Sequence, residues 1–172
     1  MGTGRLIFIT GLSGAGKTSV GALLYNRLKE NLPNLVLFDG DEIRQVFDNQ
    51  DYSAEGRRKY AESARNLLKL LTSQNINIIC CMVGMMDSVR DWNRANIPNY
   101  FEIYLKVPLD ILIKRDQKNL YSRALKGELS NVVGIDIEAE EPKSPDMLID
   151  NDGSERIEEI VDRIIDALGT LQ

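Results

Sequence analysis

Short apolar runs alternate along this chain with longer segments in which apolar residues recur at helical spacing. The runs are rich in β-branched and aromatic residues and are bounded by turn residues, which is typical of buried parallel strands. The predicted strands cover residues 5–10, 34–38, 76–83, 101–107 and 147–150. The predicted helices cover residues 18–32, 55–73, 87–94, 109–114 and 154–171. Because strand and helix alternate, we predict an α/β fold, with a five-stranded parallel sheet and helices on both of its faces.

Residues 115–141 interrupt this alternation. The segment begins with charged and turn-forming residues, and its second part, residues 131–141, is acidic and irregular. Such a stretch lacks the apolar spacing that would let it build a core. We therefore predict a mobile lid or substrate loop beside a ligand site. An ordinary surface excursion is the alternative interpretation.

Composition narrows the class of protein. The chain has 172 residues, of which 43% are hydrophobic and 27% charged, and these values favour one globular domain over residues 1–172. The formal net charge of −5, with no basic block, disfavours a nucleic-acid partner. The sequence contains no histidine, so imidazole catalysis and histidine metal ligation are excluded.

The cysteines and the chain start bear on location. Cys80 and Cys81 are neighbours in a predicted strand, where their side chains point to opposite faces, so we expect no disulfide between them and a reducing compartment. No apolar run approaches the length of a membrane span. The first predicted strand begins near Arg5, which leaves little room for a targeting peptide. We expect a cytoplasmic protein that has no membrane partner.

The segment Gly11–Thr18 (GLSGAGKT) fits the phosphate-binding pattern G-x-x-x-x-G-K-[ST] at every specified position. It follows a predicted strand and opens a predicted helix, so backbone N–H groups and the helix dipole are aimed at a polyphosphate. Lys17 can then reach the β- and γ-phosphates, and the Thr18 hydroxyl can ligate Mg²⁺. We predict that the chain binds a nucleoside triphosphate. The residues expected to contact it are Gly11, Ser13, Gly14, Ala15, Gly16, Lys17 and Thr18.

Two carboxylates, Asp39 and Asp41, follow the second predicted strand directly. Open α/β sheets bind their ligands at the carboxyl ends of the strands, so these side chains are candidates for the chemistry of the site. The alternative interpretation is a turn and a helix N-cap. A phosphate-binding loop on the preceding strand favours the functional interpretation.

At these residues the chain resembles a known family, the adenylylsulfate (APS) kinases, which are P-loop nucleotide kinases. The resemblance covers nearly the whole chain. It rests on Gly11–Thr18, Asp39–Arg44 (DGDEIR), Arg115–Glu128 (RDQKNLYSRALKGE), Gly134–Asp136 and the acidic segment 140–146 (EEPKSPD). The phosphate-binding loop occurs in many families, whereas these motifs in this order are specific.

The resemblance implies a P-loop NTPase fold and the transfer of the γ-phosphate of ATP, with Mg²⁺, to the ribose 3′-hydroxyl of a small nucleotide. It assigns catalysis to Lys17, Asp39 and Asp41, with both aspartates facing the hydroxyl and with the metal held by Thr18 and Asp41. It places Arg44 on the acceptor's phosphate and Arg115 beside the ATP base. The further residues that it assigns to the acceptor are Asn131, Val132, Gly134 and Ile135.

The sequence departs from the family on the acceptor side. The family's phenylalanine-isoleucine-serine-proline segment corresponds to Met82–Met85 here, so the serine that some relatives phosphorylate is absent. Val132 and Val133 stand where the family has an aromatic residue that stacks on adenine, and paired arginines of the third helix align with Glu62 and Ser63. Losing a stacking aromatic would cost about 1–3 kcal/mol, unless another residue such as Tyr52 or Phe47 replaces it.

Three functions stay open at this point. The first is an APS kinase that makes 3′-phosphoadenylylsulfate. The second is a relative that phosphorylates the same hydroxyl of cytidine diphosphoramidate in capsule modification, where a smaller base and a neutral terminus would tolerate the lost groups. The third is a regulatory module that binds a nucleotide without catalysis, against which the intact Asp39, Asp41 and Arg44 argue. Assembly into a homodimer is also left open.

Overall fold

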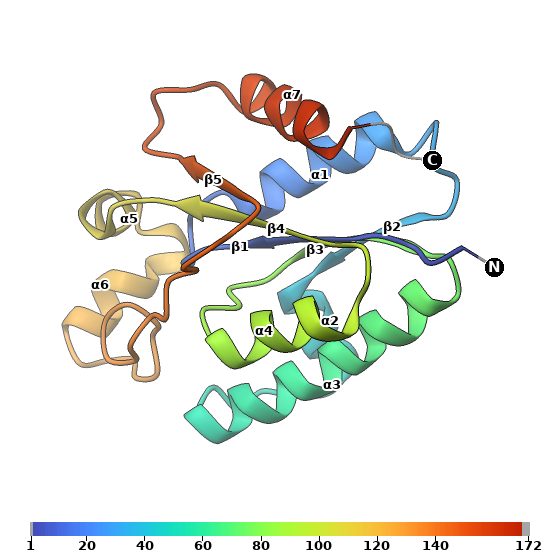
Figure 1. Cartoon of the computed structure of the whole chain (residues 1–172). Coiled ribbons are helices and arrows are strands. Elements are labelled where there is room, and N and C mark those ends of the chain that lie inside the picture. Colours follow the sequence, from blue (N-terminus) through green and yellow to red (C-terminus); the bar gives the residue numbers. More distant parts are fainter. Residues whose placement is uncertain (1, 170–172) are drawn as a thin grey trace.

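A computed structural model describes residues 2–169 of the chain as a twisted sheet between two layers of helices (Figure 1). All strand pairs are parallel, and the strand order is β2-β3-β1-β4-β5. The predicted five-stranded parallel sheet is confirmed. Its strands are β1 (Leu6–Thr10), β2 (Leu35–Asp39), β3 (Asn77–Cys81), β4 (Tyr100–Lys106) and β5 (Met147–Asp150).

Helices cover both faces of this sheet, as predicted. In Figure 1, α1 and α7 lie on one side and α2, α3 and α4 lie on the other. No helix within residues 2–169 is both long and apolar enough to cross a membrane. The helices are α1 (Lys17–Leu28), α2 (Gly40–Val46), α3 (Ala54–Ser73), α4 (Asp87–Asn96), α5 (Leu109–Arg115), the 3₁₀ turn η1 (Gln117–Asn119), α6 (Leu120–Leu125) and α7 (Ile157–Leu168).

Two hydrophobic cores explain why the central strands read as continuous apolar runs. Successive side chains of a strand point to opposite faces. In β1, Ile7 and Ile9 therefore join the core under α1 and α7, while Leu6 and Phe8 join the core over α2 and α3. All four side chains are at most 2% exposed, so neither face of β1 has room for a polar residue.

Several boundaries differ from the prediction. Helix α1 ends at Leu28 rather than at residue 32, because Leu28 accepts from both Asn31 N and Leu32 N in a closing turn. Strand β3 ends at Cys81, and the chain turns away at Gly84, whose φ is +53°. A Cβ at Gly84 would lie 2.8 Å from the Phe8 ring, so glycine is required at this turn.

Segment 115–141 is less irregular than the sequence indicates. It contains η1 and α6, which the apolar spacing did not predict, and an isolated bridge between Val133 and Ile137. Asp116 starts this part by accepting from the N–H groups of Tyr121 and Ser122, which nucleates α6. The mobility of the segment stays a prediction.

Candidate active site

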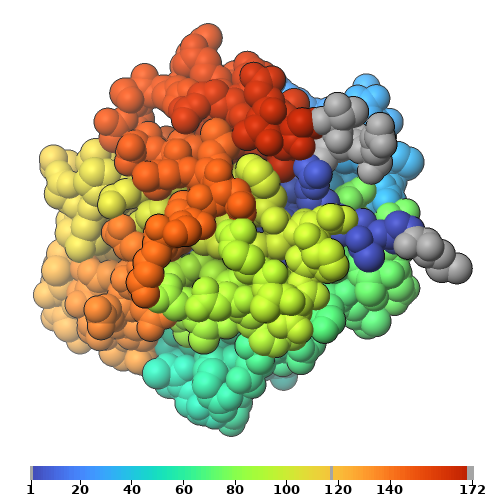
Figure 2. Space-filling model, in the orientation of Figure 1, coloured from blue at the N-terminus to red at the C-terminus, as the bar shows by residue number. Residues whose placement is uncertain are grey.

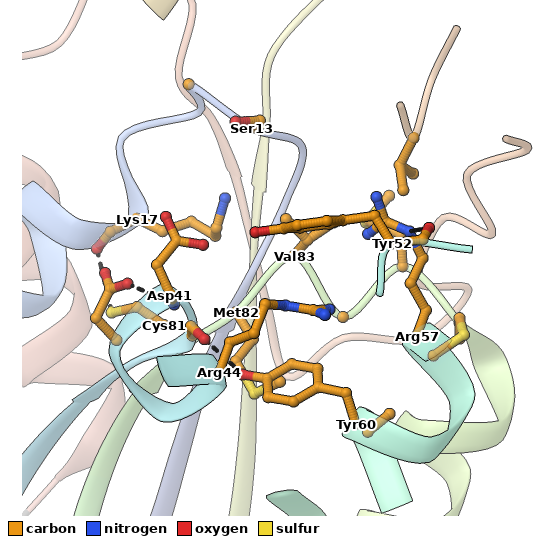
Figure 3. Close-up of a pocket in the computed structure, with 18 of the residues that line it drawn as sticks. Ser13, Lys17, Asp41, Arg44, Tyr52, Arg57, Tyr60, Cys81, Met82 and Val83 are labelled. Carbon is orange, nitrogen blue, oxygen red and sulfur yellow. Dashed lines mark hydrogen bonds between the residues drawn. The ribbon is translucent and has the colours of Figure 1, made fainter. Parts of the chain in front are cut away.

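A cavity of about 1080 Å³ opens at the carboxyl ends of β1, β2 and β3, the edge where parallel sheets bind ligands. Its wall combines the phosphate-binding loop, the start of α2, the start of α3 and the loop that follows β3. Arg115 and Lys118 line it from one side, and Val133, Ile137, Glu138 and Glu140 from another. Figure 3 shows Lys17 and Asp41 at one end and the stacked side chains of Tyr52, Arg44 and Tyr60 at the other.

The loop between β1 and α1 has the backbone of an anion cradle. Gly14 and Gly16 have φ values of +79° and +94°, and no side chain caps the first turn of α1. The N–H groups of this turn are therefore available to a phosphate. Ser13, Gly14, Gly16, Lys17 and Thr18 line the cavity.

The remaining two residues of the predicted cradle do not line the cavity. Ala15 is 1% exposed, and its carbonyl accepts from Asn151 Nδ2 at 2.8 Å. Gly11 packs so closely on β4 that a Cβ would lie 2.5 Å from the Leu105 carbonyl oxygen. Both residues shape the loop from behind.

Lys17 is the residue of the loop whose pKa the fold shifts most clearly. Its ammonium donates to the Leu12 carbonyl at 2.8 Å. Burial lowers the pKa of Lys17 from 10.5 to about 8, although the carboxylates of Asp39 and Asp41 oppose this shift. A lysine that burial makes costly to keep charged gains strongly from a polyphosphate.

Asp39 links the two halves of the site. One carboxylate oxygen accepts from the Thr18 hydroxyl at 2.7 Å, and the other accepts from the Asp41 backbone N–H at 2.9 Å. Asp39 is therefore the N-cap of α2 and, with the same carboxylate, the partner of the hydroxyl expected to hold Mg²⁺. The cap that the sequence offered as an alternative is present, and it does not compete with a place in the site.

Asp41 is more accessible. Its side chain is 66% exposed and pairs with Lys118, whose Nζ lies 3.2 Å from Asp41 Oδ2. No group of three or more Cys, Asp or Glu side chains within residues 2–169 forms a ready metal cage. The Thr18 hydroxyl and the neighbouring Asp39 carboxylate offer the one or two protein oxygens that Mg²⁺ needs when it is bound mainly through phosphate oxygens.

Arg44 is the centre of the other end of the cavity. It is 7% exposed, and its guanidinium carbon lies 4.4 Å from the centre of the Tyr52 ring and 4.2 Å from that of Tyr60 (Figure 3). Its Nη1 donates to Asn49 Oδ1 at 2.7 Å, which folds the loop before α3 around it. The stack fixes a buried positive charge between two aromatic faces.

Arg57 joins this end of the site from the first turn of α3. Its Nε donates to the Tyr52 carbonyl at 2.9 Å, and its Nη2 donates to the Asn131 carbonyl at 2.6 Å. Burial and the neighbouring Arg44 lower the pKa of Arg57. Two guanidinium groups at one end of the cavity suit an anionic ligand.

Sequence reasoning gave too little weight to three of these residues. It named Tyr52 only as an alternative stacking residue, and it did not single out Arg57 and Tyr60 as site residues. Tyr60 is 7% exposed, yet it lines the cavity and donates from its hydroxyl to the Gly40 carbonyl at 2.6 Å. The usable signal was the RRKY run at the start of a helix next to the DGDEIR motif.

The predicted acceptor residues around 131–135 lie differently from the expectation. Val132 is 4% exposed and packs in the core, while Val133 lines the cavity, so contact of Val132 with the acceptor stays a prediction. Gly134 and Ile135 line a separate hollow of about 510 Å³. Asn131 meets the site only through the carbonyl that Arg57 binds.

Glu62 also lies away from the cavity, since its carboxylate pairs with Arg58 on the outer face of α3 at 2.6 Å. Arg115 does line the cavity, at the side of the phosphate-binding loop. Its Nη2 donates to the Asn151 carbonyl at 3.4 Å. The structure thus brings Lys17, Thr18, Asp39, Asp41, Arg44 and Arg115 around one cavity.

Comparisons with known proteins agree with this geometry. The sequence profile of the adenylylsulphate kinase family matches residues 3–150. The chain is 40% identical over 163 residues to the cytidine diphosphoramidate kinase of Campylobacter jejuni, covering 95% of each chain. It is 36% identical over 152 residues to a probable adenylyl-sulfate kinase of Archaeoglobus fulgidus, covering 88% of this chain and 98% of the relative.

Among solved structures, the APS kinase of Mycobacterium tuberculosis in complex with AMPPNP and APS superposes with a TM-score of 0.87. The two sequences are 26% identical, and the match covers 99% of this chain and 100% of the other. The similarity therefore extends over the whole fold.

Proposed function

Because this chain belongs to the adenylylsulphate kinase family, we propose that it transfers the γ-phosphate of ATP to the ribose 3′-hydroxyl of an activated nucleotide. The chain is a nucleotide kinase. The observation that carries the finer proposal is the bond between Thr18 and Asp39, since it joins the phosphate-binding loop to the carboxylate pair that faces the acceptor half of the cavity. One domain spanning residues 1–172 would then hold both substrates.

Phosphoryl transfer depends mainly on positioning and on neutralising charge. Lys17 and the N–H groups of the loop would bind the β- and γ-phosphates, and the Thr18 hydroxyl would hold Mg²⁺. When bound, this ion neutralises the charge that develops on the phosphate oxygens. As the acceptor oxygen forms its bond to phosphorus, the bond from phosphorus to the bridging oxygen of ADP breaks.

We assign the hydroxyl proton to Asp41 rather than to Asp39. Both oxygens of Asp39 already accept hydrogen bonds, from Thr18 and from the backbone N–H of Asp41. Asp41 has a more exposed carboxylate, whose partner Lys118 is itself a flexible, 81% exposed side chain. A carboxylate that can approach the hydroxyl orients it and accepts its proton as the new bond forms.

The first candidate acceptor is adenylylsulfate. It appears in the name of the Archaeoglobus fulgidus relative and in the description of the superposed Mycobacterium tuberculosis structure. Tyr52 supports this candidate, because it is 46% exposed and presents an aromatic ring at the acceptor end of the cavity. Arg44 and Arg57 lie beside it and would meet the acceptor's phosphate and its charged terminus.

The second candidate acceptor is cytidine diphosphoramidate. The 40% identical relative carries that activity in its name. The acceptor side of the cavity supports it, because Met82 and Met85 stand where the resemblance places the family's phenylalanine and proline, and both line the cavity together with Met86. Methionine side chains repack readily around a base of another size. The two candidates share the hydroxyl that is phosphorylated and differ in the base.

A coupled ADP-release assay tests both levels of the proposal. The purified protein is given ATP and Mg²⁺ with adenylylsulfate, with cytidine diphosphoramidate or with no acceptor, and phosphorus NMR locates the new phosphate. We expect release that depends on an acceptor and a product phosphorylated at the 3′ position. A base that fits poorly should lower kcat/KM about thirty- to two-hundredfold, which corresponds to about 2–3 kcal/mol of lost base contact.

The control is Lys17→Ala, which removes the main cationic contact to the γ-phosphate and should abolish acceptor-dependent turnover. ADP release at the same rate with and without every acceptor would reject the kinase proposal. A clear preference for adenylylsulfate would reject the second candidate while leaving 3′-phosphorylation standing.

A further inference from the structure

The acidic segment EEPKSPD, residues 140–146, is fastened along α4, and we call it the strap. In Figure 2 its orange surface lies against the yellow-green surface of α4 and of the loop before that helix. Ion pairs join Lys143 to Asp87 at 2.8 Å and Asp146 to Arg94 at 3.0 Å. Lys143 and Asp146, three residues apart on the strap, carry opposite charges, and each pairs with a residue of the opposite charge on α4. The family resemblance marked this motif but gave it no task.

Three hydrogen bonds hold Glu140 at the start of the strap. Its backbone N–H donates to the Met85 carbonyl at 3.2 Å, and its carboxylate accepts from the Asp87 N–H at 2.5 Å. Its backbone carbonyl accepts from Arg90 Nη2 at 2.7 Å. All the polar groups of Glu140 therefore bond to the loop after β3 or to α4.

Arg90, a buried residue of α4, also joins the strap to the loop after β3. It is 3% exposed, and its Nη1 donates to the Gly84 carbonyl at 2.7 Å. Its Nε lies 3.5 Å from the buried carboxylate of Glu102. One buried guanidinium thus bonds the loop after β3 and the strap at once, and a lysine lacks the rigid fork that places separate nitrogens on the Gly84 and Glu140 carbonyls.

The contacts of Arg90 and Glu140 hold a wall of the cavity in place. Gly84, Met85 and Met86, from the loop, line the cavity, as does Glu140 from the strap. We place this wall on the acceptor side of the cavity. The neighbouring Val83 carbonyl is held separately, by the Gly11 N–H. Loss of the Arg90 contacts would therefore loosen the acceptor wall and leave the ATP half in place.

We propose that Arg90 and Glu140 are positioning residues for the acceptor nucleotide, and that they act by holding the methionine wall at Met85 and Met86 against it. This proposal rests on the kinase function proposed above. The reacting hydroxyl depends on the fit of the rest of the acceptor, and a misplacement of about 1 Å can cost up to a hundredfold in rate.

Steady-state kinetics of Glu140 variants tests the proposal. Glu140→Ala removes the carboxylate from an exposed residue, so the fold should survive, and we expect kcat/KM for the acceptor to fall about tenfold. The KM for ATP should change by less than about twofold. Glu140→Gln keeps an oxygen that can accept from the Asp87 N–H and should recover most of the loss. Ser144→Ala, which changes an exposed residue of the strap to which no contact with α4 is assigned, is the matched control and should match the wild type.

Arg90→Lys is the companion variant. We expect it to lose acceptor kcat/KM as Glu140→Ala does, and we expect the double variant to lose less than the product of the two effects, because both act on one wall. Equal losses for ATP and acceptor, or independent effects in the double variant, would overturn the proposal. A Glu140→Gln variant as impaired as Glu140→Ala would also overturn it, because charge rather than the hydrogen bond would then matter.

Hydrogen exchange of backbone amides gives a reading that needs no turnover. In Glu140→Ala, the N–H groups of Asp87 and of residue 140 should exchange faster, while those of the phosphate-binding loop should not. Unchanged exchange at these amides would overturn the proposal that Glu140 holds the wall. If the wild type turns over no acceptor, the kinase function has failed, and the exchange experiment still decides whether the wall is held as proposed.

Discussion

Raising the pH from 7 to 9.5 should lower kcat/KM for ATP about thirtyfold, because Lys17 loses its proton in the free enzyme. Burial at the cavity lowers the pKa of this lysine to about 8. The amine of Lys17 is charged below its lowered pKa and becomes neutral as the pH rises through that value. A neutral amine no longer attracts the β- and γ-phosphates, so activity is present at the low end of the range and lost at the high end.

The magnitude follows from the charged fraction of Lys17. With a pKa of about 8, that fraction falls from about 0.9 at pH 7 to about 0.03 at pH 9.5. Bound ATP adds negative charge next to the ammonium and raises its pKa again. At saturating ATP the lysine should therefore stay charged, and kcat should change by less than about twofold.

The assay is ADP release with ATP varied and the acceptor saturating, at half-unit steps of pH. Cys81, which also lines the cavity, should not interfere, since burial raises the pKa of its thiol to about 12. The control is Lys17→Arg, whose guanidinium stays charged over the whole range, so its residual kcat/KM should be flat. A flat profile for the wild type, or the same decline in Lys17→Arg, would refute the assignment of the titration to Lys17.

Three further outcomes test other parts of the molecule. Asp41→Asn should lower kcat about a hundredfold or more while the KM for ATP changes little, because the carboxylate acts on the acceptor hydroxyl; an altered KM for ATP at unchanged kcat would make Asp41 a binding residue. Tyr52→Leu should raise the KM of the acceptor about fivefold to two-hundredfold, by loss of base stacking worth about 1–3 kcal/mol, and an unchanged KM would remove Tyr52 from the acceptor site. Ile164→Ala should lower the free energy of unfolding by about 2–5 kcal/mol in urea titrations, since Ile164 is 0% exposed in the core beneath α1 and α7, and a loss below about 1 kcal/mol would contradict that packing.

The sequence by itself determined the five strands, their alternation with helices along the chain and the phosphate-binding loop. These features are local. An apolar run buried on both faces, a loop whose glycines take positive φ and a helix that begins at Lys17 are all contained within Leu6–Leu28. The position of Asp39 and Asp41 at the end of β2 follows in the same way, because a strand end fixes which edge of a parallel sheet a side chain occupies.

The sequence left the role of Asp39 undecided between helix cap and site residue. A cap is a contact over two residues and can be expected from the motif alone. The bond to Thr18 joins residues 21 positions apart and exists only because β1 and β2 are brought to the same edge of the sheet. Tertiary structure decided that one carboxylate serves both purposes.

Only the tertiary structure decided the acceptor half of the site. Whether Val132 or Val133 faces the cavity depends on how an irregular segment packs, and no periodicity records that. The stack of Tyr52 on Arg44 requires the loop before α3 to fold back on α2. Arg90 and Glu140 are separated by 50 positions and meet because the strap returns across α4 toward β5. Side chains that converge from such distant segments leave no local pattern in the sequence, since their partners are chosen by packing rather than by spacing.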